Sequence, residues 1–262
     1  MINKIFKLGL ITLLVLTLIF TLTPILFLVI RGAYTIKQCI LSEEIRFAFK
    51  LSFKTSIIST IICMLVSLPV AYTLSRLEFK FKKIVCTVLY IPMSLPHLIL
   101  GIALLLVCGN SFIGRFLESI GIDFVFTVKG IILAQVFVNI SFSIKMLKTA
   151  IEGLDFKLEF VARTLGCTKA KCFYKVILPS IKRDILSTLI ITFSRAIGEF
   201  GAVMLLVGTT RMKTELLPTA IYLNVATGDM DIAIGVATIL IIVSILTILP
   251  FEILEGKSNA RN

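Results

Sequence analysis

Charged side chains are scarce in this sequence. Asp, Glu, Lys and Arg make up 16% of the 262 residues, whereas about a quarter is typical of soluble domains. Hydrophobic residues make up 58%. This composition excludes a soluble globular domain. It predicts an all-α integral membrane protein, because a helix satisfies its own backbone hydrogen bonds where lipid offers no water.

The usual signatures of catalysis are also missing. The only histidine, His97, lies between Pro96 and Leu98, and we favour a structural role for it over proton transfer. The sequence has no G-x-S-x-G nucleophile motif. It also has no G-x-x-x-x-G-K-S/T loop, so the chain does not hold ATP by that mechanism. A membrane-embedded enzyme is therefore the weaker class, and we expect no cofactor on this chain.

Two other classes of protein find little support. An ion-driven transporter would be expected to show inverted repeats and several mid-membrane acids, but Glu199 is the only clear one. A zinc site at Cys167 and Cys172 would lack further ligands, so we expect no metal. The other four cysteines lie in or beside apolar blocks and are expected to pack as small hydrophobes: Cys39, Cys63, Cys86 and Cys108.

Long apolar runs dominate what is present. The first is longer than the core of a signal peptide and has no small-residue cleavage site after it, so it should be retained. Each run has about the 20 residues that cross the hydrocarbon layer as a helix. The sequence therefore predicts six transmembrane helices in a single domain, residues 1–262. They are expected at Leu8–Ile30, Thr55–Leu74, Ile84–Val107, Gly130–Leu147, Ile185–Val207 and Ile232–Leu254.

The net charge of +12 sets the expected orientation. The basic residues cluster in short segments between apolar blocks, where they orient a membrane protein, so nucleic-acid binding is a weak hypothesis. They are more numerous in the segments that lie inside when the N-terminus is inside. We therefore expect a cell-membrane protein with both termini and the segment 150–182 in the cytoplasm.

Helix-breaking residues divide the segment 150–182 into two parts. Asp155–Leu165 is compatible with a helix, Gly166 interrupts it, and Lys169–Leu178 resumes it until Pro179. One interpretation is a basic connector held near anionic membrane lipid. The other is a rigid knob of two short helices that docks on a partner.

The order of residues in this knob resembles the coupling loop of ABC importer permeases. Glu159-Phe-Val-Ala-Arg-Thr-Leu-Gly166 is followed, after nine residues, by Val176-Ile-Leu-Pro179. The family triplet Glu-Ala-Ala is replaced by Phe160-Val161-Ala162, with Glu159 one place early. The resemblance implies a separate ATPase that carries ATP and Mg²⁺ and receives the loop. The residues implied in this contact are Glu159, Phe160, Ala162, Arg163, Leu165, Gly166, Leu178 and Pro179.

A second motif narrows the resemblance to the molybdate, tungstate and sulfate branch of these permeases. Ser194-Arg-Ala-Ile-Gly-Glu-Phe-Gly201 is similar to its Arg-Ala-x-Gly-Glu-Phe-Gly signature, and Ser94–Leu105 to its Leu-Pro-Pro segment, with His97 at the second proline. Leu217–Tyr222 and Thr227–Asp229 look more like the molybdate members. The resemblance implies the type I importer fold, a homodimer, and an external oxyanion-binding protein. Sulfate import is the alternative.

Arg195 and Glu199 lie four residues apart in the fifth apolar block, which would place them on one helical face. Charges at this depth need a partner or a wet cavity. They form either a neutralised pair that locks helices together or a gate in the translocation path. The gate would include Arg195, Gly198, Glu199, Phe200, Gly201, Ser194 and Asn139. Ser141, Ser143 and Thr192 could also face the anion, although such side chains more often bond to backbone.

Overall fold

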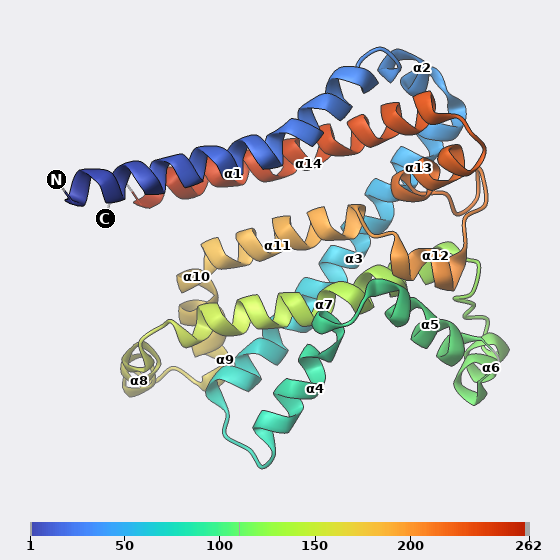
Figure 1. The fold of residues 1–262 in the computed structure, drawn as a ribbon. Coiled ribbons are helices and arrows are strands. Elements are labelled where there is room, and N and C mark those ends of the chain that lie inside the picture. The colour runs from blue at the N-terminus through green and yellow to red at the C-terminus, as the bar shows by residue number, and fades with distance from the viewer. Residues whose placement is uncertain (1, 110, 260–262) are drawn as a thin grey trace.

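The computed structural model describes residues 2–109 and 111–259, with side chains described for 4–109 and 111–249. Every regular element in these ranges is a helix (Figure 1), so the predicted all-α class is confirmed. Four helices are long and apolar enough to cross a membrane. They are α1 (Ile2–Gly32), α3 (Glu43–Arg76), α7 (Val128–Glu152) and α14 (Met230–Asn259).

Two further spans are broken near their middle. Each consists of two helices that meet at a sharp bend, of 111° in the first span and 53° in the second. The expectation of one continuous helix for the third and fifth apolar blocks is therefore wrong. The first broken span is α4 (Lys82–Ser94) with α5 (His97–Cys108), and the second is α11 (Lys182–Ile197) with α12 (Gly201–Val207).

Local chemistry explains both breaks. Leu95 has an extended backbone (φ −92°, ψ 143°) because a residue before proline is sterically excluded from the helical region, and Pro96 follows it. In the second span, Phe200 leaves the helical region (φ −120°, ψ −53°). The side chain of Glu199 accepts a hydrogen bond from the Ala202 N–H at 2.9 Å, which satisfies a free donor at the start of α12.

The centre of the molecule is the contact between α3 and α7. Small hydroxyl residues of α3 allow close approach and are buried there. Gln135 of α7 donates to the Ser56 hydroxyl at 3.3 Å and to the Ala196 carbonyl at 2.9 Å, so it joins three spans. The buried hydroxyl residues of α3 are Ser52, Thr55, Ser56, Ser59, Thr60 and Ser67.

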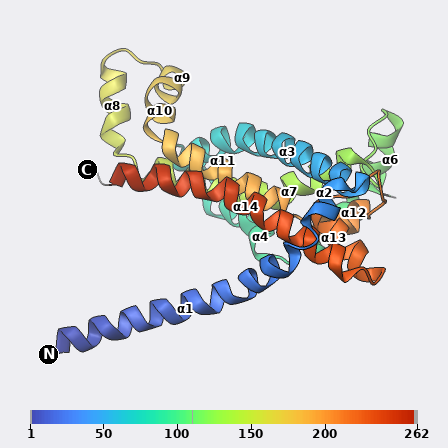
Figure 2. The same cartoon turned by 90° about the horizontal axis from the view of Figure 1, so that it is seen from above.

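The two ends of the molecule differ. One end, on the left in Figures 1 and 2, carries both ends of the described chain and the knob elements. The other end carries three short helices. The knob consists of α8 (Phe156–Thr164), α9 (Lys169–Cys172), the π-helix η1 (Phe173–Ile177) and α10 (Leu178–Ser180). The opposite end has α2 (Ile36–Leu41), α6 (Phe112–Ser119) and α13 (Leu217–Ala226).

The first span departs from the rest of the bundle. Helix α1 contacts α14, and the Thr238 hydroxyl reaches the Leu28 carbonyl at 3.4 Å. Figure 2 shows that α1 then diverges from the other helices towards its N-terminal end. The apolar side chains along this helix are consequently exposed in the single chain.

The second half of the knob ends one residue after the predicted position. Helical structure was expected to stop at Pro179, but this residue lies inside α10, which continues to Ser180. Proline lacks an N–H and normally clashes with the preceding turn. Here the preceding turn is the wider π-helix, closed by the Leu178 N–H on the Phe173 carbonyl. Such a turn accommodates the proline, and the helix ends one residue later, at Ser180.

Candidate functional site

Helix α8 is fixed to the bundle by Glu159. This side chain is buried, and its Oε1 forms an ion pair with the guanidinium of Arg76 at the end of α3. The Tyr72 hydroxyl donates to its Oε2 at 3.3 Å. Arg76 also donates to the Leu154 carbonyl at 3.0 Å and lies 5.2 Å from the centre of the Phe156 ring. The knob is therefore held at its base by a buried charge pair.

The opposite face of α8 is open and carries large apolar side chains together with Lys157, Arg163 and Thr164. Phe160 is 65% exposed and Leu165 is 80% exposed, and Phe156, Leu158 and Val161 are exposed as well. A hollow of about 480 Å³ lies beside this face, between the end of α8 and the start of α9. Arg163 lines it, whereas Ala162 points into the protein. Large apolar side chains on an exposed short helix are typical of a protein contact surface.

Gly166 ends α8 with a defined cap. Its φ of +86° is in the left-handed region that suits glycine. The Cys167 N–H bonds to the Ala162 carbonyl at 3.0 Å and the Gly166 N–H to the Arg163 carbonyl at 3.0 Å. This pair of bonds is the Schellman arrangement. In the second half of the knob, Leu178 is half-buried and Pro179 is exposed.

The breaks of the two bent spans face each other. His97 Nδ1, at the start of α5, lies 2.8 Å from Glu199 Oε2, and the Glu199 side chain is 1% exposed. The sequence alone suggested no partner for His97, and the structure supplies one 102 positions away. A Cβ atom on Gly201 would lie 3.1 Å from the His97 Cβ and 3.2 Å from the Leu98 nitrogen. A larger residue would require the start of α5 to shift by a few tenths of an ångström.

Arg195 and Glu199 do not pair with each other among the described ion pairs. Helix α11 ends at Ile197, so the four-residue helical spacing fails across the bend at Gly198. Arg195 instead donates to Asn139 Oδ1 at 3.0 Å and stacks 4.9 Å from the centre of the Phe142 ring. The interpretation of a mutually neutralised pair is therefore wrong, and the two contacts described for Arg195 are with neutral side chains.

The remaining candidates divide between structure and the path. Ser143 and Thr192 hydrogen-bond to each other at 2.9 Å and are buried, which joins α7 to α11. Ser141 is buried, while Ser194 is half-buried. Phe200 contacts the ring of Tyr222 at a centroid distance of 5.7 Å. Of the predicted residues Ser141, Ser143, Thr192, Ser194 and Phe200, only Ser194 and Phe200 are partly exposed.

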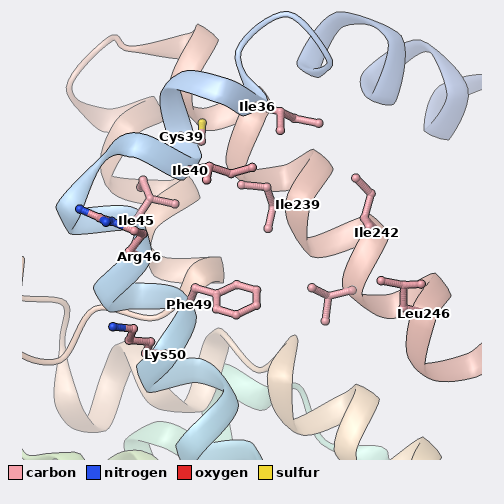
Figure 3. Close-up of a pocket in the computed structure, with 11 residues that line it drawn as sticks. Ile36, Cys39, Ile40, Ile45, Arg46, Phe49, Lys50, Ile239, Ile242 and Leu246 are labelled. Carbon is pink, nitrogen blue, oxygen red and sulfur yellow. The ribbon is translucent and has the colours of Figure 1, made fainter.

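Two of the hollows that the sequence did not indicate lie between helices. One, of about 610 Å³, lies between α4, α7 and α11 and contains Lys145. The other, of about 470 Å³, is an apolar groove near α2 at the far end (Figure 3). In Figure 3, Phe49 of α3 lies across this groove from Ile239 and Ile242 of α14. The groove contains none of the predicted site residues.

Comparison with known proteins identifies the family. Residues 67–259 match the model of the binding-protein-dependent transport system inner membrane component. The chain is 34% identical over 203 residues to the molybdenum transport system permease protein ModB of Mycobacterium tuberculosis, covering 77% of this chain and 76% of that protein. It is 30% identical over 242 residues to the molybdate/tungstate transport system permease protein WtpB of Methanocaldococcus jannaschii, covering 92% and 93%.

Similarity extends to a sulfate permease and to a solved structure. The sulfate transport system permease protein CysT of Salmonella typhimurium is 28% identical over 215 residues, covering 82% of this chain and 78% of that protein. A chain in the crystal structure of a bacterial alginate ABC transporter, in complex with its alginate pentasaccharide-bound periplasmic protein, superposes with a TM-score of 0.78. That chain is 20% identical, and the match covers 95% of this chain and 93% of that one. The protein belongs to the binding-protein-dependent transport system inner membrane components, with the fold of an ABC importer permease.

Proposed function

We propose that this chain forms the pore of an ATP-driven importer of molybdate or tungstate, as a homodimer with two ATPase subunits and an external binding protein. The observation that carries the proposal is helix α8. It presents an exposed apolar face at the end of the molecule that also holds both chain ends, and a buried ion pair fixes it to α3. A rigid, apolar knob suits force transfer from a partner better than a loose lipid-binding loop does.

The knob residues would have different roles in the coupling contact. Phe160, Arg163 and Leu165 are exposed and would enter the ATPase surface. Glu159 and Ala162 face inward and would keep α8 at a fixed angle. Gly166, Leu178 and Pro179 would shape the turn and its return to α11. On this proposal the knob and both termini face the cytoplasm, and ATP and Mg²⁺ are held by the ATPase.

The gate would lie where the two bent spans meet. Glu199 holds the start of α12 and pairs with His97 of α5, while Gly201 allows the two half-helices to touch. Gly198 and Phe200 form the bend itself. Arg195 lies one turn before the bend, held by Asn139. Closure of the ATPase dimer would pull on α8 and change the packing at this bend, which alternately opens the path outward and inward.

The choice of anion rests on similarity. The relatives named for molybdenum and for molybdate/tungstate transport are 34% and 30% identical to this chain, and two relatives named for sulfate transport are 28% and 30% identical. Arg195, a cation without a carboxylate partner beside the bend, is compatible with any of these dianions. Sulfate import is therefore the second candidate, within the same class of importer.

The test is transport by the reconstituted assembly. The chain would be purified with the ATPase and the binding protein encoded in neighbouring genes, and uptake of labelled molybdate, tungstate and sulfate into ATP-loaded proteoliposomes would be compared. We expect uptake of molybdate and tungstate that requires all three components. Uptake of sulfate alone would select the second candidate, and uptake without the ATPase would contradict the proposed class.

A further inference from the structure

Lys145 is a charged side chain inside a transmembrane span. It lies seven residues before the end of α7, or roughly 10 Å along the helix at 1.5 Å per residue. Its ammonium group lies 5.8 Å from the centre of the Tyr90 ring. No carboxylate lies within ion-pair distance of it among the described residues. The side chain is exposed in the single chain, and an unpaired charge within a span normally faces water or a partner of opposite charge.

The cavity of about 610 Å³ between α4, α7 and α11 meets this requirement. Lys145 and Thr149 are four residues apart and share the face of α7 that lines it. Ser187 of α11 lines it from the opposite side. The Thr188 hydroxyl is bonded to the Asp184 carbonyl at 2.7 Å, but no described hydrogen bond occupies the hydroxyls of Thr149 and Ser187. One cation and two hydroxyls without a described hydrogen bond therefore line the same cavity.

This cavity is connected to the bend through Phe142. The Phe142 ring lines the cavity and also carries the guanidinium of Arg195, at 4.9 Å. Arg195 lies 13 residues from the start of α11, roughly 20 Å along that helix. Arg195 is therefore farther from this end of the bundle than Lys145, and it does not line the cavity itself. Neither has a carboxylate partner in the described part of the chain.

We infer that this cavity is a transit site for a tetrahedral oxyanion on its way to the cytoplasm. The anion passes from Arg195 to Lys145, where Thr149 and Ser187 donate hydrogen bonds to its oxygens. Asp184 is the only acidic residue of the lining. It lies near the start of α11, and its negative charge there favours release from the mouth. A single lysine binds a dianion weakly in a wet site, as a conduit that must release its cargo requires.

The inference rests on the proposed import of an oxyanion, and Lys145→Gln tests it. The complete transporter, with ATPase and binding protein, would be reconstituted and its initial rate of molybdate uptake measured. We expect the rate to fall about tenfold or more, a loss of roughly 1.4 kcal/mol or more. Lys145→Arg, which keeps the charge, should stay within about twofold of the parent. Assembly with the ATPase, followed by size-exclusion chromatography, should be unchanged.

Lys148→Gln is the matched control. Lys148 lies on the same helix but pairs with Glu152 at 2.6 Å and is not part of the cavity lining, so uptake should be nearly unchanged. Parent-like uptake by Lys145→Gln would overturn the transit site while leaving the importer intact. Loss of assembly in that variant would also overturn it, because the lysine would then be structural. Failure of the unaltered transporter to move any oxyanion would instead contradict the proposed function.

Discussion

The carboxylate of Glu159 and the guanidinium of Arg76 form a buried ion pair that joins helix α8 to the end of α3. The two residues are 83 positions apart in the sequence. Arg76 also holds the Leu154 carbonyl at the entrance to α8. A displacement of α8 therefore moves α3, which contacts α7 and α11 at the centre of the bundle.

Removal of Glu159 should damage this connection. Glu159→Ala leaves the Arg76 charge buried and unpaired, which typically costs about 3–5 kcal/mol. We expect a lower midpoint of thermal unfolding in detergent, and ATP hydrolysis that no longer drives uptake. The double variant Glu159→Ala/Arg76→Ala should recover part of the stability, since no unpaired charge remains.

The pair Lys82 and Glu78 provides the control for this change. It is also an ion pair at this end of the molecule, at 3.0 Å, but Glu78 is 89% exposed. Exposed pairs contribute little, because water screens them. Glu78→Ala should leave both unfolding and coupling nearly unchanged. An equal loss in both variants would mean that burial of the Glu159 pair has no special importance.

Gly166→Ala tests the cap of α8. Open space surrounds the position, so the only penalty is the left-handed φ of +86°, which costs an L-residue roughly 1–2 kcal/mol. We expect weaker association with the ATPase, measured by co-purification, while membrane insertion stays normal. Gly153→Ala is the matched control, because Gly153 has an ordinary φ of −68° and should tolerate the methyl group.

His97→Ala tests the contact between the two bends. The Glu199 carboxylate would keep the Ala202 N–H but lose its other partner, and a buried group left unsatisfied costs about 1–3 kcal/mol. We expect the gate to leak: ATP hydrolysis should proceed without the binding protein at a higher rate than in the parent. His97→Gln, which retains a donor, should restore much of the control. Parent-like ATPase activity in His97→Ala would contradict the role of this contact.

The sequence predicts the fold better than it predicts the site. Six apolar blocks and the hinge at Gly166 follow from local composition, and the structure has up to six spans and a helix end at those places. Pro96 is also a local signal for a helix break, but it lies in a continuous run of apolar residues, from which a single helix was predicted. The partners of Glu159 and of Glu199 come from distant spans. No periodicity within one helix could identify Arg76 or His97.

Arg195 shows that a local spacing can also predict a contact that the folded structure does not have. The four-residue spacing to Glu199 predicts a shared helical face only if the helix is continuous, and the bend at Gly198 removes that condition. Lys145 likewise lies within an apolar block of the sequence. Its charge contributed only to the count of basic residues from which the orientation was predicted. Its importance depends on a cavity formed by three helices, and that cavity depends on tertiary packing.

A buried acid at the far end of the molecule makes stability dependent on pH. Glu215 lies in the loop before α13 and is fully buried. Burial raises the pKa of this carboxyl from its ordinary value of 4.5 to about 7, and repulsion from Glu44 adds to the effect. Arg211, which pairs with Glu44 at 3.1 Å, opposes it. The folded protein therefore retains a proton that the unfolded chain releases.

Glu215→Gln should remove this dependence. Between pH 4.5 and about 7 the folded state binds more protons than the unfolded state, so stability falls as the pH rises through this window. At roughly 1.4 kcal/mol per pKa unit, the loss over about 2.5 units is at most about 3.5 kcal/mol. The parent should unfold at a lower temperature at pH 8 than at pH 5.5, and the Gln variant should show a smaller difference. Glu118→Gln, at an exposed acid, should behave as the parent does; a parent-like slope in Glu215→Gln would assign the titration to another group.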